Sequence, residues 1–312
     1  MSLYIGIDVG GTTVKGAVID KSGTVYAEDS SPTQKGDRLA DVISTLTERL
    51  ISTVGKPKSH FKGVGIGSAG MIDAENGSIV FAGNLDVRNV PVAKLVESKV
   101  KIPVKITNDA NAAALGEAKF GAGKSYSDSI LVTLGTGVGG GIIIGGKLFE
   151  GNKSAGAEIG HMVIERGGDA CSCGRRGCFE AYSSATALIK RTKWAMEEDA
   201  GAAIWTSCTS DTVTGRTAFD FMDTDVSARE VVDWYLKYLA CGLLNLANIF
   251  RPQVIMLGGG VSGQGKKLTV PLQNLLNKEL FGGADYAPVE IKTATLGSKA
   301  GALGAAALWI ED

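Results

Sequence analysis

Three of the five cysteines and one of the two histidines lie close together in the chain. Cys171 and Cys173 form a Cys-x-Cys pair, Cys178 follows five residues after Cys173, and His161 lies ten residues before the pair. Three thiolates and one imidazole are a closed ligand set of the kind that structural Zn²⁺ takes, and nearby glycines allow a tight chelating turn. The residues therefore predict a zinc site, with a reactive or disulfide-bonded cysteine cluster as the alternative.

Two carboxylates bracket these ligands. Glu158 lies three residues before His161, and Glu180 lies two residues after Cys178. A structural zinc site stiffens the surrounding loop and supplies no reactivity of its own. We therefore expect the loop to hold Glu158 and Glu180 against a polyhydroxyl substrate.

Glycine-rich turns between strands suggest phosphate binding, because their backbone N–H groups can surround a phosphate without a helix. The segment Asp8-Val9-Gly10-Gly11-Thr12 lies between two predicted strands. Asp8 is placed to hold Mg²⁺ through water, and Lys15 follows on the second strand. The alternative is a Gly-Gly hairpin that binds nothing, with Lys15 simply solvated.

Two further glycine turns follow predicted strands. The turn with Gly135, Thr136 and Gly137 offers a second set of backbone amides for phosphate. The turn with Gly259 and Gly260 offers backbone without side chains, against which a nucleoside could lie. The dinucleotide pattern G-x-G-x-x-G occurs at residues 65–70 and 135–140, but neither match opens a helix, so a Rossmann site is not predicted.

The segment Asn108-Asp109-Ala110-Asn111 joins a predicted strand to a predicted helix. Propensity alone favours Asp109 as the N-cap of that helix. Asp109 also lies at the carboxyl end of a strand, where a carboxylate could accept an alcohol proton during phosphoryl transfer. Asp109 is therefore the candidate general base, with capping as the alternative.

Hydrophobic periodicity predicts an α/β protein, and the length of 312 residues favours two domains. A strand–glycine turn–strand–turn–strand pattern at residues 3–27 returns at 129–149, which indicates an internal duplication whose halves would face each other across a cleft. Residues 200–226 are polar and unpatterned, so we expect a surface excursion there. The other expected strands are 61–66, 104–107 and 254–257, and the expected helices are 37–54, 90–100, 109–120, 184–196, 228–249 and 298–310.

Bulk properties narrow the function classes. Lys and Arg number 32 against 33 Asp and Glu, and a net charge of −1 offers no electrostatic footprint for nucleic acid or anionic lipid. No apolar run is long enough to span a membrane, and no basic leader precedes the first strand. We therefore expect a cytoplasmic protein without nucleic-acid or membrane partners.

In order and over essentially the whole chain, these motifs resemble those of the ROK family of sugar kinases, which belongs with the actin-like, Hsp70-like and hexokinase-like ATPases. Within the family, the bacterial ATP-dependent glucokinases match most closely. The resemblance implies a two-domain α/β ATPase fold, with duplicated mixed β-sheet cores flanking a cleft. We expect a small N-terminal domain at residues 1–118 plus 298–312 and a larger C-terminal domain at 119–297 that carries the zinc loop. The resemblance rests on residues 8–12, 108–111, 134–141, 156–161, 171–180 and 257–262.

The resemblance also implies a reaction, ATP-dependent phosphorylation of the 6-hydroxyl of a hexose, most simply glucose, with Asp109 as the general base. His161 would serve twice, with one ring nitrogen on zinc and the other toward the sugar. The residues matching sugar-binding positions are Gly70, Asn84, Asn108, Glu158, His161 and Glu180. Those matching the nucleotide site are Gly10, Gly11, Thr12, Gly135, Thr136 and Gly137 for phosphates, and Gly259 and Gly260 for adenosine.

Several alternatives remain open. The acceptor could be fructose, mannose, allose or an N-acetylhexosamine, or the protein could be a sugar sensor without catalysis. A zinc-dependent nucleic-acid binder conflicts with the charge. The family's repressor branch carries an N-terminal helix-turn-helix, which a first strand at Leu3 does not match, and its polyphosphate-using branch lacks the zinc cysteines. Relatives are usually dimers or tetramers, so we expect a homo-oligomer, although the apolar stripe through Tyr235, Leu239, Leu243 and Leu246 is better explained as core.

Overall fold

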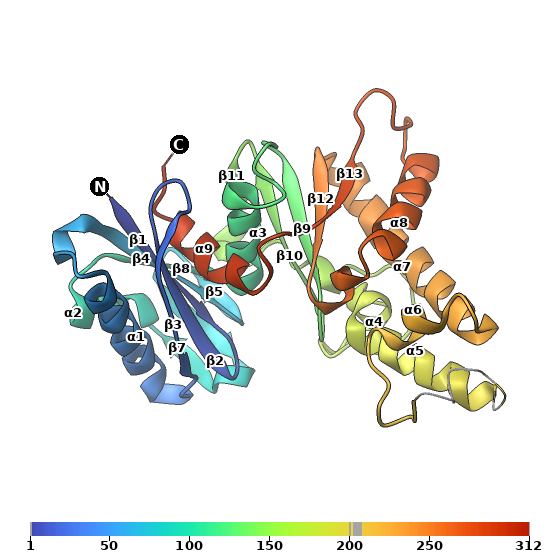
Figure 1. The fold of residues 1–312 in the computed structure, drawn as a ribbon, viewed down its shortest axis with the longest axis horizontal. Helices are drawn as coiled ribbons and strands as arrows, with labels where there is room; N and C mark the ends of the chain where they lie inside the picture. Colours follow the sequence, from blue (N-terminus) through green and yellow to red (C-terminus); the bar gives the residue numbers. More distant parts are fainter. Residues whose placement is uncertain (1, 200, 202–207, 312) are drawn as a thin grey trace. The chain divides into compact units, whose positions relative to one another are not determined.

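The computed structural model describes residues 2–199, 201 and 208–311 as a mixed α/β protein (Figure 1). The chain forms two compact units. Unit 1 comprises Met1–Leu131, Gly141–Ala157 and Thr295–Asp312, and unit 2 comprises Val132–Gly140 and Glu158–Ala294. The domain limits expected from the sequence, after residues 118 and 297, stay a prediction. Within the described part of the chain, no helix is both long and apolar enough to cross a membrane.

A five-stranded sheet in the order β3-β2-β1-β4-β8 forms the centre of unit 1. β1, β2 and β3 pair antiparallel, whereas β4 runs parallel to β1 and β8 runs parallel to β4. As in any strand, successive residues of β1 face opposite sides of the sheet. The strands are β1 (Leu3–Val9), β2 (Thr13–Ile19), β3 (Val25–Pro32), β4 (Phe61–Ser68) and β8 (Val104–Asn108).

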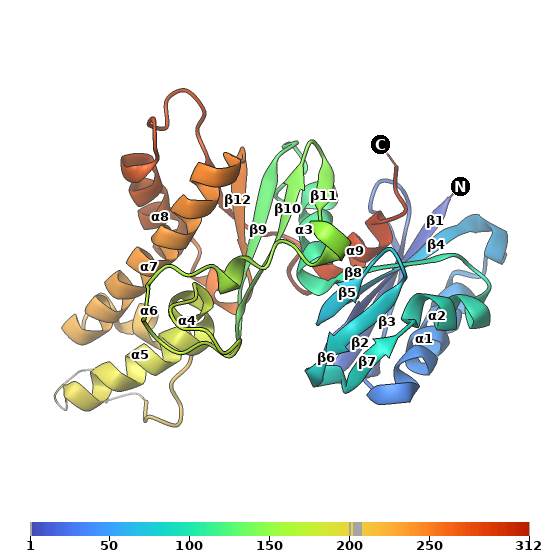
Figure 2. The same ribbon diagram turned by 180° about the vertical axis from the view of Figure 1, so that it is seen from behind.

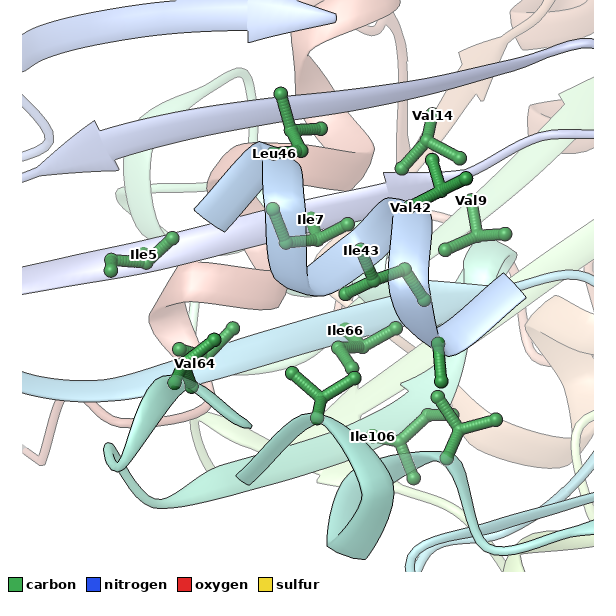
Figure 3. Close-up of a cluster of buried hydrophobic side chains, with 14 of the residues drawn as sticks. Ile5, Ile7, Val9, Val14, Val42, Ile43, Leu46, Val64, Ile66 and Ile106 are labelled. Atoms are coloured by element: carbon green, nitrogen blue, oxygen red, sulfur yellow. The ribbon is translucent and has the colours of Figure 1, made fainter. Parts of the chain in front are cut away.

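Helices α1 (Leu39–Val54) and α2 (Val92–Val100) build an apolar core with this sheet. Figure 3 shows Ile5 and Ile7 of β1 with Ile43 and Leu46 of α1, and all four side chains are buried. The spacing of apolar residues in α1 matches the expected amphipathic helix, which begins two residues later than predicted because Gly36–Arg38 forms a 3₁₀ turn.

Helices α3 (Asp109–Phe120) and α9 (Ala300–Ala307) pack against each other, and α9 also packs on β1 and β4. The helix approaches the sheet so closely that a side chain on two strand glycines would clash. A Cβ atom on Gly6 would lie 1.8 Å from the Ala302 carbonyl oxygen, and one on Gly65 would lie 1.7 Å from that of Ala305. Glycine is therefore required at both positions.

A small antiparallel sheet, β5-β6-β7, was not predicted from the sequence. Its strands are too short to show a clear alternation: β5 (Met71–Asp73), β6 (Ser78–Ala82) and β7 (Val87–Val90). Val90 ends β7, so the helix expected from residue 90 begins at Val92, with Pro91 as its N-cap.

The second sheet has the order β11-β10-β9-β12-β13. In both sheets the first strand in sequence, β1 or β9, lies at the centre. The next two strands lie on one side of it, and two later strands lie on the other side. This confirms the duplication expected from the sequence. The strands are β9 (Ser129–Leu134), β10 (Val138–Ile144), β11 (Lys147–Phe149), β12 (Val254–Gly258) and β13 (Glu290–Thr293).

Five helices belong to unit 2 in the described part of the chain (Figure 2). The stripe of Tyr235, Leu239, Leu243 and Leu246 on α7 is buried, which confirms the interpretation as core. Helix α8 was missed, although Leu268, Leu272 and Leu276 recur at helical spacing and are buried. The helices are α4 (Glu180–Ser183), α5 (Ala185–Glu198), α6 (Thr217–Phe221), α7 (Val226–Phe250) and α8 (Lys266–Glu279).

The expectation of a surface excursion at residues 200–226 is wrong for its described C-terminal part. Val213 is buried, and Phe219 of α6 is fully buried with its ring edge-on to Tyr235. The apolar residues in this stretch were too sparse to show a period, so only tertiary packing reveals them. Residues 200 and 202–207 lie outside the described part of the chain.

Glu117 on α3 is a fully buried carboxylate that binds the segment leading back into unit 1. Its Oε2 accepts from the N–H groups of Ala122 at 2.9 Å and Thr295 at 3.1 Å, and from the Thr295 hydroxyl at 3.3 Å. Its Oε1 accepts from the Leu296 N–H at 2.7 Å. A buried charge of this kind is tolerated because its hydrogen-bond capacity is used.

We expect Glu117→Ala to lower the free energy of unfolding by about 3 kcal/mol or more, because it leaves several buried donors without an acceptor. Thermal and urea unfolding followed by circular dichroism measure this loss. Glu48→Ala, which removes an exposed ion pair with Lys58, should cost at most about 1 kcal/mol. Equal stability of the two variants would contradict the structural role of Glu117.

Candidate active site and metal centre

The acidic candidates of unit 1 lie at the carboxyl ends of three parallel strands. β1, β4 and β8 are in register, so that Val9 pairs with Ser68 and Ser68 pairs with Asn108. Asp8 precedes the last residue of β1, and Asp109 follows the last residue of β8. Parallel strands end at one edge of their sheet, and ligands bind at such edges in open α/β sheets. The sheet thereby brings both aspartates to the same edge.

Asn108, and not Asp109, is the N-cap of α3. Asn108 Oδ1 accepts from the N–H groups of Ala110 at 2.8 Å and Asn111 at 3.3 Å. Asp109 is the first residue of the helix and accepts from the Ala110 N–H at 2.9 Å. The capping role that propensity favours for Asp109 is therefore wrong, and the Asp109 carboxylate has hydrogen-bonding capacity left for a ligand.

The structure brings several predicted sugar-binding residues of unit 1 together. Asn108 Nδ2 donates to the Gly70 carbonyl at 3.2 Å. Gly70 has φ +107, and a Cβ there would lie 2.4 Å from the Phe81 carbonyl oxygen, so only glycine fits. A Cβ on Gly11 would lie 3.6 Å from Asn84 Nδ2, which places Asn84 beside the first glycine turn.

The first glycine turn is held by backbone hydrogen bonds. The Gly10 N–H donates to the Thr13 carbonyl at 3.1 Å, and the Thr33 hydroxyl donates to the Gly10 carbonyl at 2.7 Å. Thr12 is exposed at the end of the turn. This turn therefore presents a preformed backbone, as a phosphate-binding loop requires.

Burial and like charge act together on the two aspartates. Burial, then the negative charge of Asp109, raise the pKa of Asp8 from 3.8 to about 6, and the Lys15 ammonium opposes this shift. Burial also raises the pKa of Asp109. Lys15 pairs with Asp8 in the β1–β2 register. Two acids in a partly desolvated site attract a cation, and carboxylate oxygens suit Mg²⁺.

The four predicted zinc ligands in unit 2 lie together. One ligand atom from each of His161, Cys171, Cys173 and Cys178 falls within 4.8 Å of all the others. Cys173 Sγ and Cys178 Sγ are 3.7 Å apart, and Cys171 Sγ is 3.6 Å from His161 Nδ1. Tetrahedral Zn²⁺, with Zn–S of about 2.3 Å and Zn–N of about 2.0–2.1 Å, requires separations of about 3.8 and 3.6 Å. The donor set therefore fits Zn²⁺.

The geometry also distinguishes the two nitrogens of His161. Nδ1 is the nitrogen near Cys171 Sγ, so Nε2 is left to carry the N–H when a metal is bound. Burial raises the pKa of the Cys178 thiol, so that a cation is needed to keep it as a thiolate at neutral pH.

Backbone hydrogen bonds close the segment from His161 to Glu180, called the zinc loop below. The Cys171 N–H donates to the Arg175 carbonyl at 2.9 Å, and the Gly177 N–H donates to the Asp169 carbonyl at 2.7 Å. Gly177 has φ +81, and a Cβ there would lie 1.7 Å from the Glu165 carbonyl oxygen. The loop therefore has a defined backbone that does not depend on the ligands alone.

Glu180 connects the zinc loop to the second glycine turn. Its Oε2 accepts from the Val138 N–H at 3.0 Å, and its Oε1 accepts from the Ser172 hydroxyl at 3.1 Å. A Cβ on Gly137 would lie 2.2 Å from Glu180 Oε2. Neither Ser172 nor Val138 was identified from the sequence, because nothing in their types or spacing marks them as partners of a glutamate.

The remaining glycine candidates of unit 2 also meet. Gly259 has φ +81, and a Cβ there would lie 2.5 Å from the Leu134 carbonyl oxygen at the end of β9. A Cβ on Gly135 or on Gly260 would have no neighbour within 4 Å. These two glycines thus offer accessible backbone, as a nucleotide-binding surface requires.

The backbone just before Glu158 is closely packed and includes a left-handed residue. A Cβ on Gly156 would lie 3.0 Å from the Glu150 carbonyl oxygen, and Ala157 adopts φ +62. Alanine in this left-handed region costs roughly 1–2 kcal/mol. Glu158 itself follows in an exposed position.

The duplicated sheets, glycine turns and partly buried aspartates define a sugar kinase of the hexokinase-like ATPase fold. The chain belongs to the ROK family, whose pattern matches residues 4–312. It is 37% identical to the glucokinase of Streptomyces coelicolor, covering 99% of this chain and 98% of the relative. It is 38% identical to the glucokinase of Halalkalibacterium halodurans, covering 96% and 93%.

A solved structure agrees with this assignment. The ROK family glucokinase from Streptomyces griseus, in complex with glucose and AMPPNP, superposes with a TM-score of 0.79 at 35% identity, covering 98% of this chain and 99% of that chain. The chain is also 31% identical to the xylose repressor of Caldicellulosiruptor bescii and covers 78% of that protein's length.

We expect purified protein to hold one Zn²⁺ per chain, and Cys173→Ser to lose it and melt at a lower temperature. Structural zinc contributes directly to folding free energy. Metal content by atomic emission and thermal melting with and without a chelator measure both effects. Cys208→Ser, outside the cluster, should keep the metal. A metal-free protein with unchanged melting would contradict the zinc assignment.

We expect Asp8→Asn to stabilise the metal-free protein at pH 8 and to lose this advantage toward pH 4. Because the folded-state pKa of Asp8 is raised from 3.8 to about 6, the folded chain binds more protons than the unfolded chain in this window. Wild-type stability therefore falls as the pH rises through it, by at most about 3 kcal/mol. Melting temperatures between pH 4 and 8 test this expectation. A stability difference between variant and wild type that widens toward low pH would contradict this expectation. Asp233→Asn, at an exposed position, serves as the control.

Proposed function

We propose that this protein transfers the γ-phosphoryl group of ATP to the 6-hydroxyl of glucose. Glucokinases matching nearly its whole length at 37–38% identity support this activity, as does a similar structure solved with glucose and AMPPNP. The observation in this chain that carries the proposal is the state of Asp109. Asp109 follows the last residue of a strand, and it does not cap helix α3 because Asn108 takes that role. Burial raises the pKa of its carboxyl group.

In the proposed reaction, Asp109 accepts the proton of the sugar 6-hydroxyl while the oxygen of that hydroxyl attacks the γ-phosphorus of ATP. The bond from phosphorus to the β,γ-bridging oxygen breaks, and ADP leaves with the electron pair. A raised pKa brings Asp109 closer to the working pH, where a general base combines ionisation with proton affinity. Mg²⁺ would neutralise phosphate charge, with Asp8 as its contact through water.

The proposal assigns sugar binding to six residues. They are Asn84, Asn108, the Gly70 backbone, Glu158, His161 and Glu180. Uncharged sugars are bound through paired hydroxyls, so carboxylates and amides are suitable partners. In His161, zinc on Nδ1 would leave Nε2–H as an oriented donor.

Nucleotide binding is assigned to the glycine turns. The proposal places phosphates against Gly10, Gly11, Thr12, Gly135, Thr136 and Gly137, and adenosine against Gly259 and Gly260. The open backbone at Gly135 and Gly260 supports this role. Lys15 is assigned to the charge balance around Asp8, whose pKa it lowers.

Another hexose could be the preferred acceptor, because the pocket shape that selects one sugar is not given by residue types. A coupled assay of ATP with glucose, fructose, mannose, allose and N-acetylhexosamines ranks them by kcat/KM. The highest value for glucose is expected, and a higher value for another sugar would replace glucose in the proposal.

A non-catalytic sugar sensor is the second candidate, since the chain is also similar to a xylose repressor. Sugar-dependent melting without ADP release would favour it.

The proposal further includes a homo-oligomer, either a dimer or a tetramer, which light scattering tests. It also includes a cytoplasmic location, which cell fractionation tests.

We expect Asp109→Asn to lower kcat about 10²–10⁴-fold while the dissociation constants of glucose and AMPPNP stay within about threefold, because the base is lost and the shape is kept. Steady-state kinetics and calorimetric titration separate the two effects. Asp37→Asn, at an exposed position in unit 1, should leave kcat unchanged. Near-normal turnover of Asp109→Asn would remove Asp109 from the role of base.

A further inference from the structure

Ser172 lies between two zinc ligands and directs its hydroxyl at Glu180. Ser172 Oγ donates to Glu180 Oε1 at 3.1 Å, and Cys171 Sγ lies 3.6 Å from the same oxygen. The other oxygen, Oε2, accepts from the Val138 N–H at 3.0 Å. The carboxylate is therefore held at both oxygens by two separate segments of unit 2.

Of the two groups beside Oε1, the Ser172 hydroxyl makes the shorter contact, at 3.1 Å against 3.6 Å for Cys171 Sγ. A hydroxyl is also a stronger hydrogen-bond donor than a thiol. The Ser172 hydroxyl is therefore the main side-chain donor to Oε1. Because hydrogen bonds to a charged acceptor are stronger than neutral ones, this contact fixes the orientation of the carboxylate.

The residue on the other oxygen belongs to the second glycine turn. Val138 begins β10 immediately after residues 135–137. The backbone of Val138 also packs against Gly160, the residue just before the zinc loop. A Cβ on Gly160 would lie 2.0 Å from the Val138 carbonyl oxygen. Gly137 has no room for a side chain beside Glu180. The turn therefore rests on Glu180 and Gly160 with little freedom to move.

We propose that Ser172 is a positioning residue, which fixes the carboxylate of Glu180 and through it ties the zinc loop to the turn at residues 135–138. With Oε1 and Oε2 each occupied once, the remaining acceptor positions of Glu180 point in set directions. A sugar hydroxyl then meets an acceptor that is already oriented, which lowers the entropy cost of binding. The sugar part of this inference rests on the proposed function, whereas the link to the turn does not.

Ser172→Ala tests the inference against Ser172→Thr, which restores a hydroxyl. In the zinc-loaded protein without ligands, hydrogen exchange of the amides in the 134–140 peptide should accelerate about three- to thirtyfold in Ser172→Ala. The glucose dissociation constant should rise about three- to tenfold, as expected for losing one ordinary hydrogen bond in an exposed position. Ser172→Thr should return both values to within about twofold of the wild type.

Zinc content and melting temperature should be the same in all three proteins, which separates positioning from loss of the metal site. Ser98→Ala removes an exposed hydroxyl that donates to the Leu95 carbonyl, and it serves as the matched control. Unchanged exchange at 134–140 in Ser172→Ala overturns the proposal, as does a change that threonine fails to reverse. If the wild type phosphorylates no hexose, the proposed function falls, but the exchange measurement still decides the role of Ser172.

Discussion

The parallel register of β1, β4 and β8 is the constraint on which the chemistry of unit 1 depends. It ends all three strands at one edge, so that two acids far apart in sequence share one small region. Helix α9 packs close to this edge, where a Cβ on Gly301 would lie 2.7 Å from Asp8 Cγ. The packing removes water from the carboxylates and raises the pKa of Asp8. The fold thus places ionisable carboxylates in a partly desolvated region, which lowers the free energy of unfolding when they are ionised.

In unit 2 the corresponding constraint is the zinc loop. Backbone hydrogen bonds and four clustered ligand residues define its shape, and its last residue, Glu180, contacts the turn at residues 135–138. Zn²⁺ held by these four residues would stiffen the loop further and would fix the orientation of the His161 imidazole. The Glu180 carboxylate connects this loop to the glycine turn. Rigidity of this kind keeps polar groups ready for a ligand without reorganisation.

Elements with a strong period were predicted correctly from the sequence. The apolar alternation of β1 and β2 and the stripe of α1 needed only local information. The three short strands β5, β6 and β7 were missed because a strand of three to five residues shows too little alternation. Phe219 was missed because its partner, Tyr235, is distant in sequence.

For the site, the sequence by itself determined the residue types: the Cys₃His set, the glycine turns and the Asn108-Asp109 pair. These follow from side-chain chemistry and from spacing along the chain. Only the tertiary structure decided which side chain caps α3, which nitrogen of His161 faces the cysteines, and that Ser172 and Val138 hold Glu180. The physical reason is that both Asn and Asp can cap a helix, both imidazole nitrogens can bind a metal, and any hydroxyl or amide can donate. Distance and direction choose among them, and those exist only once the chain is folded.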